Sequence, residues 1–254
     1  MRDLETPFVI FPLGDSAITI DLGNLIEEGL NGRALAIAAW LKDRPFPGLL
    51  DIIVAYSSVS VFYDPFTVRN GDTACPDGVF GIVRRRLEEA WAASSPMSGM
   101  EAAGPLVRIP VCYEEDYGPD LSLLGRAKGL SREEIIDLHG SVVYRIFMIG
   151  FLPGFPYMGK VDPLLAMGRK QRPVPVAAGG VGIAGDQTGI YPVNSPGGWH
   201  IIGRTPLSLF DPHAPIPVLL KPGDPVQFVA ISAAEFRELS QPRAVYSGDG
   251  CRDR

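Results

Sequence analysis

The sequence predicts an α+β protein in which a small two-layer domain precedes a β-barrel, and three observations support this fold class. The first third of the chain alternates β-rich runs with two segments of helical periodicity. Residues 94–104 are small and lack an apolar period, as expected of a linker. Short β-rich runs broken by glycine and proline follow, a pattern typical of closed barrels. We therefore expect an N-terminal domain at 1–93 and a barrel domain at 105–247.

The N-terminal domain is expected to place strands in one layer and two helices in the other. The runs FVIF and AITIDL predict two strands separated by the turn-like PLGDS. Apolar residues then recur at helical spacing over 25–43, and Pro45 ends this helix. The runs LDIIVAY and VSVFYDP predict two more strands before a second amphipathic helix at about 77–92. Together these elements indicate a ferredoxin-like sandwich.

The barrel domain opens with the β-rich run LVRIPVCY after the linker. A short helix is predicted to end at Gly129, and the next begins at Ser131, where Ser131 and Glu134 match a capping box. The run VYRIFMIGF then leads into a segment rich in glycine and proline, residues 150–211. Aromatic and aliphatic residues continue through this segment, so we expect tight turns between short strands rather than disorder.

Composition and charge exclude several classes of function. The chain has 254 residues, a net charge of −6 and a pI near 5.1, which argues against a nucleic-acid-binding protein because phosphates require a basic face. No apolar run is long enough for a membrane span, and the charged N-terminus does not resemble a signal peptide. Cys75, Cys112 and Cys251 are far apart, so neither a metal site nor a disulfide framework is indicated. We expect a cytoplasmic protein.

Two glycine-rich segments resemble nucleotide-binding motifs. Residues 180–185 match GxGxxG, but the sequence that follows cannot form the helix that a dinucleotide site needs. Residues 154–160 match most of GxxxxGK, but Val161 stands where the magnesium-binding hydroxyl belongs, and Asp162-Pro163 disfavours a helix. We interpret the first as turns of a barrel and the second as a structured loop with an exposed Lys160.

His200 and Arg204 are the most informative polar pair. Four residues apart on an alternating strand, they are expected to face the same side, where they could bind a carboxylate or polarise a carbonyl. A barrel histidine hydrogen-bonded to backbone is the equal alternative for His200. His139 is interpreted as structural and His213 as a solvated turn residue. No complete catalytic set is found in this one chain, and no Ser-His-Asp order or HExxH motif occurs.

Several segments carry a family resemblance when taken together and in order. They are GDSAITIDL (14–22), YDP (63–65), GFLPGFPYMG (150–159), the long block from Ala178 to Pro212, and KPGDPVQF (221–228). In these segments the chain resembles the B-subunit family of ATP-dependent 5-oxoprolinase. That family is also labelled allophanate hydrolase subunit 1, and it includes the sporulation-kinase inhibitor proteins.

The resemblance implies a fold, an activity and partners. It implies an α+β N-terminal domain and a cyclophilin-like β-barrel domain. It implies pairing with a homologous barrel protein, the C subunit, and with the A subunit, in a complex that cleaves 5-oxo-L-proline to L-glutamate. That complex uses ATP with Mg to phosphorylate the lactam oxygen, and no ATP site is located in this chain. Two alternatives stay open: a regulatory inhibitor of a sensor histidine kinase, and the carboxyltransferase half of a biotin-dependent urea carboxylase.

The resemblance assigns no residue roles, so candidates are chosen by chemistry. Carboxylate and imidazole groups suit proton transfer, and guanidinium and amide groups suit binding of a substrate carboxylate or lactam. The catalytic candidates are Asp186 and His200; the substrate-binding candidates are Arg172, Gln187, Asn194 and Arg204; and Lys160 is a candidate for contact with the cofactor phosphate.

Overall fold

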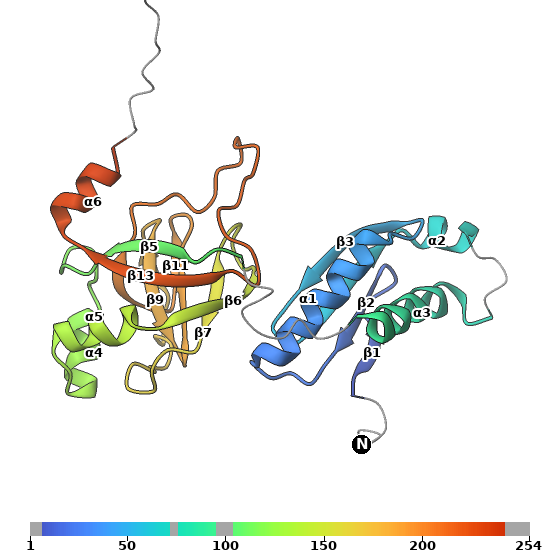
Figure 1. Ribbon diagram of the computed structural model, residues 1–254, viewed down its shortest axis with the longest axis horizontal. Coiled ribbons are helices and arrows are strands. Elements are labelled where there is room, and N and C mark those ends of the chain that lie inside the picture. The colour runs from blue at the N-terminus through green and yellow to red at the C-terminus, as the bar shows by residue number, and fades with distance from the viewer. Residues whose placement is uncertain (1–6, 72–75, 95–103, 242–254) are drawn as a thin grey trace, which may run out of the picture.

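The computed structural model describes residues 7–71, 76–94 and 104–241. The N-terminal elements form one lobe and the barrel forms the other (Figure 1). Each lobe has its own hydrophobic core, one built from residues between Ile18 and Ala90 and the other from residues between Ile109 and Phe228. Most of the expected linker, 95–103, lies outside the described residues, so the domain boundaries stay a prediction.

The N-terminal lobe is a four-stranded antiparallel sheet with the strand order β1-β2-β4-β3. Two long helices pack on it, and a short helix follows the last strand. The predicted two layers are confirmed, although the chain order is β-β-α-β-β-α-α rather than the β-α-β-β-α-β of a ferredoxin-like fold. The elements are β1 Val9–Pro12, β2 Ala17–Asp21, α1 Glu28–Asp43, β3 Leu49–Val54, β4 Ser58–Tyr63, α2 Pro65–Gly71 and α3 Gly78–Ala93.

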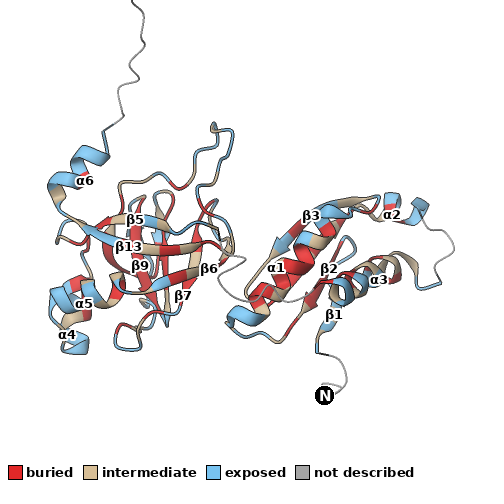
Figure 2. Cartoon of the chain, in the orientation of Figure 1, coloured by how far each residue is buried: buried red, intermediate tan, exposed pale blue. Residues whose placement is uncertain are grey.

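Burial explains why the two long helices form where the periodicity predicts them. Ala34, Ile37 and Leu41 of α1 lie on one helical face and are fully buried. Leu87 and Ala90 of α3 are also fully buried. Figure 2 shows this buried stripe running along α1 beside the sheet. Helix formation and core formation are therefore one event in this lobe, since the apolar stripe becomes buried only when the helix docks.

The C-terminal lobe is a closed barrel with the strand order β10-β7-β6-β13-β5-β12-β9. The pair β13–β5 is parallel, and the other ladders are antiparallel. The predicted β-barrel is thereby confirmed. The strands are β5 Val107–Cys112, β6 Val143–Ile149, β7 Pro156–Gly159, β9 Gly180–Ala184, β10 Gln187–Ile190, β12 His200–Arg204 and β13 Pro225–Ile231.

In the described part of the C-terminal lobe, the helices α4, α5 and α6 and a two-stranded ribbon accompany the barrel strands. The capping box predicted at Ser131 is present, with the Ser131 N–H donating to Glu134 Oε2 at 2.7 Å and the Glu134 N–H donating to Ser131 Oγ at 3.2 Å. A separate two-stranded ribbon is formed by β8 and β11. The elements are α4 Leu121–Lys128, α5 Arg132–Gly140, β8 Val174–Val176, β11 Ser195–Gly197 and α6 Ala233–Leu239.

His139 is a structural residue of the barrel core, as interpreted from the sequence. It is fully buried, and its ring stacks on Phe228 with centroids 4.4 Å apart. Its Nδ1 lies 2.8 Å from the Tyr113 hydroxyl, and its Nε2 lies 3.0 Å from the Thr188 hydroxyl. Burial lowers the pKa of His139 to about 3. The imidazole is therefore neutral at physiological pH, with both ring nitrogens partnered.

A polar contact joins the two lobes. Asn31 of α1 is fully buried, and its Nδ2 donates to the carbonyl of Phe147 on β6 at 2.9 Å. Arg145, also on β6, donates from Nε to Asn31 Oδ1 at 3.2 Å. Asn31 also donates to the carbonyls of Ala55 and Tyr56 in the loop between β3 and β4. One side chain thus fixes that loop and the barrel wall relative to α1.

No helix in the described part of the chain is long and apolar enough to cross a membrane. The cytoplasmic location expected from the sequence stays a prediction.

Candidate functional site

Three of the predicted site residues meet at one end of the barrel. The turn between β9 and β10 contains Gly185, whose φ of +63° suits glycine, and the exposed Asp186. Gln187 opens β10 and pairs with Gly159 at the end of β7. The Val161 N–H donates to the Asp186 carbonyl at 2.9 Å, which holds the exposed Lys160 between these two backbone contacts.

Tyr56 from the N-terminal lobe completes this group. It lies in the loop between β3 and β4, and its hydroxyl accepts a hydrogen bond of 2.7 Å from Gln187 Nε2. Burial raises the pKa of Tyr56 to about 12, although the bond from Gln187 lowers it in part. The hydroxyl is therefore protonated at neutral pH, and because it accepts from Gln187, its own hydrogen remains for another acceptor. We call Tyr56, Lys160, Asp186 and Gln187 the junction site.

A largely buried row of aromatic rings, the aromatic wall, continues from the junction site. The Tyr56 ring meets the edge of Tyr157 with centroids 6.0 Å apart. The ring centroid of Tyr157 lies 5.8 Å from that of Trp199 and 4.7 Å from that of Phe155. Phe155 in turn meets the edge of Tyr191 at 5.1 Å. Phe155, Tyr191 and Trp199 are buried, so the partly exposed Tyr157 is the ring of this wall beside Tyr56 on which a flat ligand ring could stack.

The expectation that His200 and Arg204 share one strand face is wrong. His200 pairs with Ile183 of β9, Arg204 pairs with Gly180, and a β-bulge lies between Ile201 and Gly203. Ile183 and Gly180 are three residues apart on one strand and point to opposite sides, so their partners do too. The bulge adds one residue to β12 and reverses the alternation on which the prediction depended.

The two residues also have separate partners. His200 is buried, its Nε2 donates to the Gly168 carbonyl at 2.9 Å, and its Nδ1 is buried without a partner among the described residues. Arg204 donates from Nε to the Ala178 carbonyl at 2.7 Å, and its guanidinium lies 5.8 Å from the Phe236 ring centroid. The backbone-bonded histidine given as the alternative therefore describes the position of His200.

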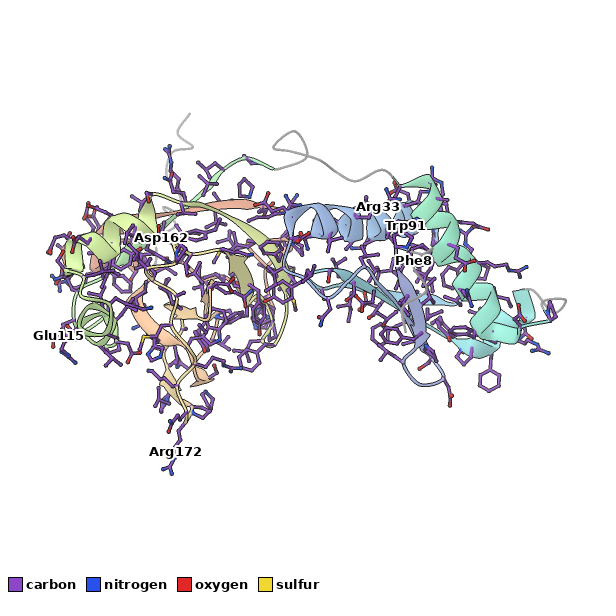
Figure 3. All side chains as sticks on the ribbon, turned by 90° about the horizontal axis from the view of Figure 1, so that it is seen from below. Phe8, Arg33, Trp91, Glu115, Asp162 and Arg172 are labelled. Carbon is purple, nitrogen blue, oxygen red and sulfur yellow. The ribbon has the colours of Figure 1, made fainter. Side chains whose placement is uncertain are left out.

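Asn194 and Arg172 lie away from the junction site. Asn194 Oδ1 accepts from the Ala178 N–H at 2.8 Å, so Asn194 and Arg204 hold the two sides of one peptide segment. Arg172 is exposed just before β8, and Figure 3 shows it at the far tip of its loop, pointing into solvent. Their assignment to substrate binding stays a prediction that the geometry does not favour.

Neither glycine-rich motif has the structure of a nucleotide site. Residues 180–184 of the GxGxxG match form β9, which is hydrogen-bonded to β10 and β12 on its two sides. Residues 156–159 of the GxxxxGK match form β7, paired with β6 and β10. Their backbone N–H groups serve the barrel ladders, so these segments do not fit the phosphates of ATP. Among the residues that the structure describes, no three His, Cys, Asp or Glu gather as a metal site would require.

Sequence reasoning missed Tyr56, Tyr157 and Asn31. Tyr56 is separated by 131 positions from its partner Gln187, and Asn31 by 116 from Phe147. Tyr56 follows a β-rich run and precedes Ser57-Ser58, a context that predicts only a turn. Asn31 was a weak signal, since an amide at a buried position of a helix implies a specific hydrogen-bond partner.

Comparison with known proteins adds the family. The family model of the carboxyltransferase domain, subdomains C and D, matches residues 8–220. A protein from Bacillus subtilis (strain 168), named as the B subunit of 5-oxoprolinase, is 43% identical over 238 residues, which cover 92% of this chain and 97% of that protein. Its namesake from Escherichia coli O157:H7 is 36% identical over 85% of this chain and 93% of its own length.

More distant or longer relatives share the architecture. The crystal structure of TTHA0988 superposes with a TM-score of 0.72 at 37% identity, covering 85% of this chain and 40% of that chain. This chain thus spans less than half of that protein. Urea amidolyase from Saccharomyces cerevisiae is 22% identical over 95% of this chain, which corresponds to 14% of that protein.

Proposed function

The chain belongs to the family of carboxyltransferase domains, subdomains C and D, among the proteins named as the B subunit of 5-oxoprolinase, and on this premise we propose that it is a non-autonomous subunit of an ATP-dependent 5-oxoprolinase. The complex would cleave 5-oxo-L-proline to L-glutamate. The observation that carries the proposal is the 43% identity with the Bacillus subtilis protein over nearly the full length of both chains.

The junction site offers groups that suit a lactam. The Tyr56 hydroxyl is a neutral donor that could bond to the lactam carbonyl oxygen. The exposed Asp186 carboxylate is an acceptor for the lactam N–H or for a water. The exposed Lys160 adds a cation beside them. In this proposal the chain binds and orients the substrate, and a partner protein supplies the remaining groups.

ATP chemistry is assigned to the partner proteins. Neither motif segment of this chain fits the phosphates, because both are strands with their N–H groups in the barrel ladders. Lys160 could meet a phosphate presented by a partner, since its ammonium is exposed at the same end as Asp186. The expected partners are the A subunit of the complex and the homologous barrel protein, its C subunit.

The ribbon is our candidate surface for the homologous barrel. Its outer side forms an open hollow of about 740 Å³. Three prolines contribute to its lining, and Val174 and Val176 add apolar surface. A hydrophobic, proline-stiffened ribbon that protrudes from a barrel is suited to contact with another protein.

Reconstitution tests the proposal. This chain is co-expressed with homologues of the A and C subunits, and glutamate release from 5-oxoproline is measured with and without ATP. We expect release that requires ATP and all three chains. A matched preparation lacking only this chain is the control. If the three-chain complex assembles and is folded but releases no glutamate, the proposed activity is wrong.

A second activity is favoured by one observation, the similarity to urea amidolyase over 95% of this chain. On that reading the chain would be part of a carboxyltransferase acting on urea. The same co-purified complex, supplied with a biotin carboxylase, a biotinylated carrier, bicarbonate, ATP and urea, separates the two activities. Urea-dependent ATP use without glutamate release would favour the carboxyltransferase.

A further inference from the structure

Arg169 is an exposed cation whose two chain neighbours are held in place, while no ion pair joins its own charge to another residue in the described part of the chain. The Gly168 carbonyl accepts from His200 Nε2 at 2.9 Å. The Lys170 N–H donates to the Gly198 carbonyl at 2.7 Å, and Lys170 Nζ lies 2.6 Å from Asp120 Oδ2. Arg169 itself is exposed and has no ion pair or hydrogen bond within the described ranges of the chain. The backbone on both sides of Arg169 is therefore held in place, and the guanidinium remains available to a ligand.

The guanidinium of Arg169 lies against Gly198. An added Cβ on Gly198 would stand 3.5 Å from Arg169 Nε and 3.6 Å from Nη2, so the side chain crosses directly over this residue. Gly198 precedes Trp199, which contacts Tyr157 at 5.8 Å. Arg169 is thus in van der Waals range of Gly198, the residue next to Trp199 of the aromatic wall.

The charge of Arg169 acts on the hydroxyl of Tyr157. Its ring is fixed between Tyr56, Phe155 and Trp199. Burial raises the pKa of Tyr157, and the nearby Arg169 charge offsets part of that rise, so the hydroxyl is a neutral donor. No hydrogen bond to this hydroxyl is formed by the residues in 7–71, 76–94 and 104–241.

The hydroxyl of Tyr191, unlike that of Tyr157, is already used within the protein. This hydroxyl receives the Trp199 N–H and packs against Gly197, and the residue is 1% exposed. Tyr191 is therefore part of the framework. Tyr157 and Arg169 are the members of this cluster whose polar groups remain for a ligand.

We propose that Arg169 and the Tyr157 hydroxyl bind the carboxylate of the substrate, with its flat lactam ring lying against the partly exposed Tyr157 toward Tyr56. A guanidinium donates two parallel hydrogen bonds to a carboxylate, and a phenol can add a third. A single cation matches a monoanion better than a phosphate. This inference rests on the proposed function, and it replaces Arg172 and Arg204 with Arg169 as the carboxylate-binding arginine.

The test compares two ligands that differ only in the carboxylate. Isothermal titration calorimetry on the three-chain complex measures binding of 5-oxoproline and of 2-pyrrolidone, the same lactam ring without the carboxylate. The wild-type complex should prefer 5-oxoproline. Arg169→Gln should weaken 5-oxoproline binding about tenfold to a hundredfold, the range expected for one charged hydrogen-bonded contact. It should leave 2-pyrrolidone binding unchanged.

Kinetics provide the second readout. Arg169→Gln should raise KM for 5-oxoproline by about the same factor with little change in kcat, because the carboxylate itself undergoes no bond change and is bound equally in the ground and transition states. Gly198→Ala keeps the charge and places a methyl group at ordinary van der Waals distance from the guanidinium, so it should leave KM nearly unchanged. Arg126→Gln, an exposed arginine on α4, is the matched control and should leave KM unchanged.

Three results would overturn the inference, and each differs from a failure of the proposed function. The first is a wild-type complex that cleaves 5-oxoproline while Arg169→Gln leaves KM and binding unchanged. The second is a raised KM for Arg172→Gln instead, which would restore the sequence-based assignment. The third is loss of assembly by Arg169→Gln in size-exclusion chromatography, which would make Arg169 an interface residue. If the folded wild-type complex neither binds nor cleaves 5-oxoproline, the proposed function and this inference fall together.

Discussion

The two ends of strand β9 carry polar residues of similar type in different states. At the Ala184 end, Asp186 and Lys160 are exposed, and Gln187 reaches across to Tyr56 of the other lobe. At the Gly180 end, Arg204 and Asn194 bond to the carbonyl and the N–H of Ala178. A polar residue among glycines is therefore informative about function only when the local backbone has not already used its hydrogen bonds.

The Ala184 end of β9 depends on the polar contact between the lobes that Asn31 makes. We expect removal of the Asn31 side chain to have the largest effect of the changes considered. Asn31→Ala leaves the buried carbonyl of Phe147 and the Arg145 side chain without this partner. The free energy of unfolding should fall by about 3 kcal/mol, since each unsatisfied buried group costs on the order of 1–3 kcal/mol. Urea denaturation measures it, with Asn194→Ala as the control. An unchanged denaturation midpoint would show that the lobes need no polar contact.

A change at Tyr56 tests whether the junction site, at the Ala184 end of β9, takes part in the reaction. Tyr56→Phe removes the hydroxyl and keeps the ring contact with Tyr157. If Tyr56 donates to the lactam oxygen, kcat of the reconstituted complex should fall about a hundredfold, as for loss of one oxyanion donor. Tyr117→Phe is the matched control, a tyrosine whose ring packs on Phe236. Equal activity of the two variants would remove Tyr56 from the site.

The buried His139 and the exposed His213 should differ in how they affect stability as the pH changes. Burial lowers the pKa of His139 to about 3, whereas an unfolded histidine titrates near its ordinary value of about 6.5. As the pH falls below about 6.5 the unfolded chain binds the proton first, so stability is lost, by about 2 kcal/mol at pH 5. His139→Gln should flatten this part of the stability–pH curve, and the exposed His213→Gln should not. A curve unchanged by His139→Gln would contradict the buried neutral imidazole.

Substitution of Arg204 should have the smallest effect of these changes, and it should alter stability without altering activity. Its Nε donates to the Ala178 carbonyl, a bond that lysine cannot reproduce with the same geometry. Arg204→Lys should lower the free energy of unfolding by about 1 kcal/mol and leave KM and kcat of the complex unchanged. A lost activity with normal stability would restore Arg204 as a substrate-binding residue and break the distinction between the two ends.

Local signals predicted much of the fold. The helix expected at 25–43 is Glu28–Asp43, the one expected at about 77–92 is Gly78–Ala93, and the capping box at Ser131 is present. Helical period, caps and stop residues depend on neighbours a few positions away, so one sequence contains them.

The site was only partly predictable because its geometry depends on distant residues. Asp186, Gln187 and Lys160 were chosen for their chemistry, and the barrel register brings them together. Tyr56 was missed because the contact that gives it meaning spans two lobes. His200 was misplaced relative to Arg204 because a single bulge reverses strand alternation, and its local signal, Gly203 inside the strand, was not used.

Glutamate release by two matched complexes tests the central claim most directly. One complex carries Asp186→Asn at the exposed turn between β9 and β10, and the other carries Asn194→Ala beside the ribbon. Both are assayed with 5-oxoproline and ATP after size-exclusion chromatography has shown equal assembly. We predict that Asp186→Asn reduces the rate about a hundredfold or more, as for loss of an acid–base group, while Asn194→Ala retains it. Full activity of Asp186→Asn, or loss only in Asn194→Ala, would contradict the account.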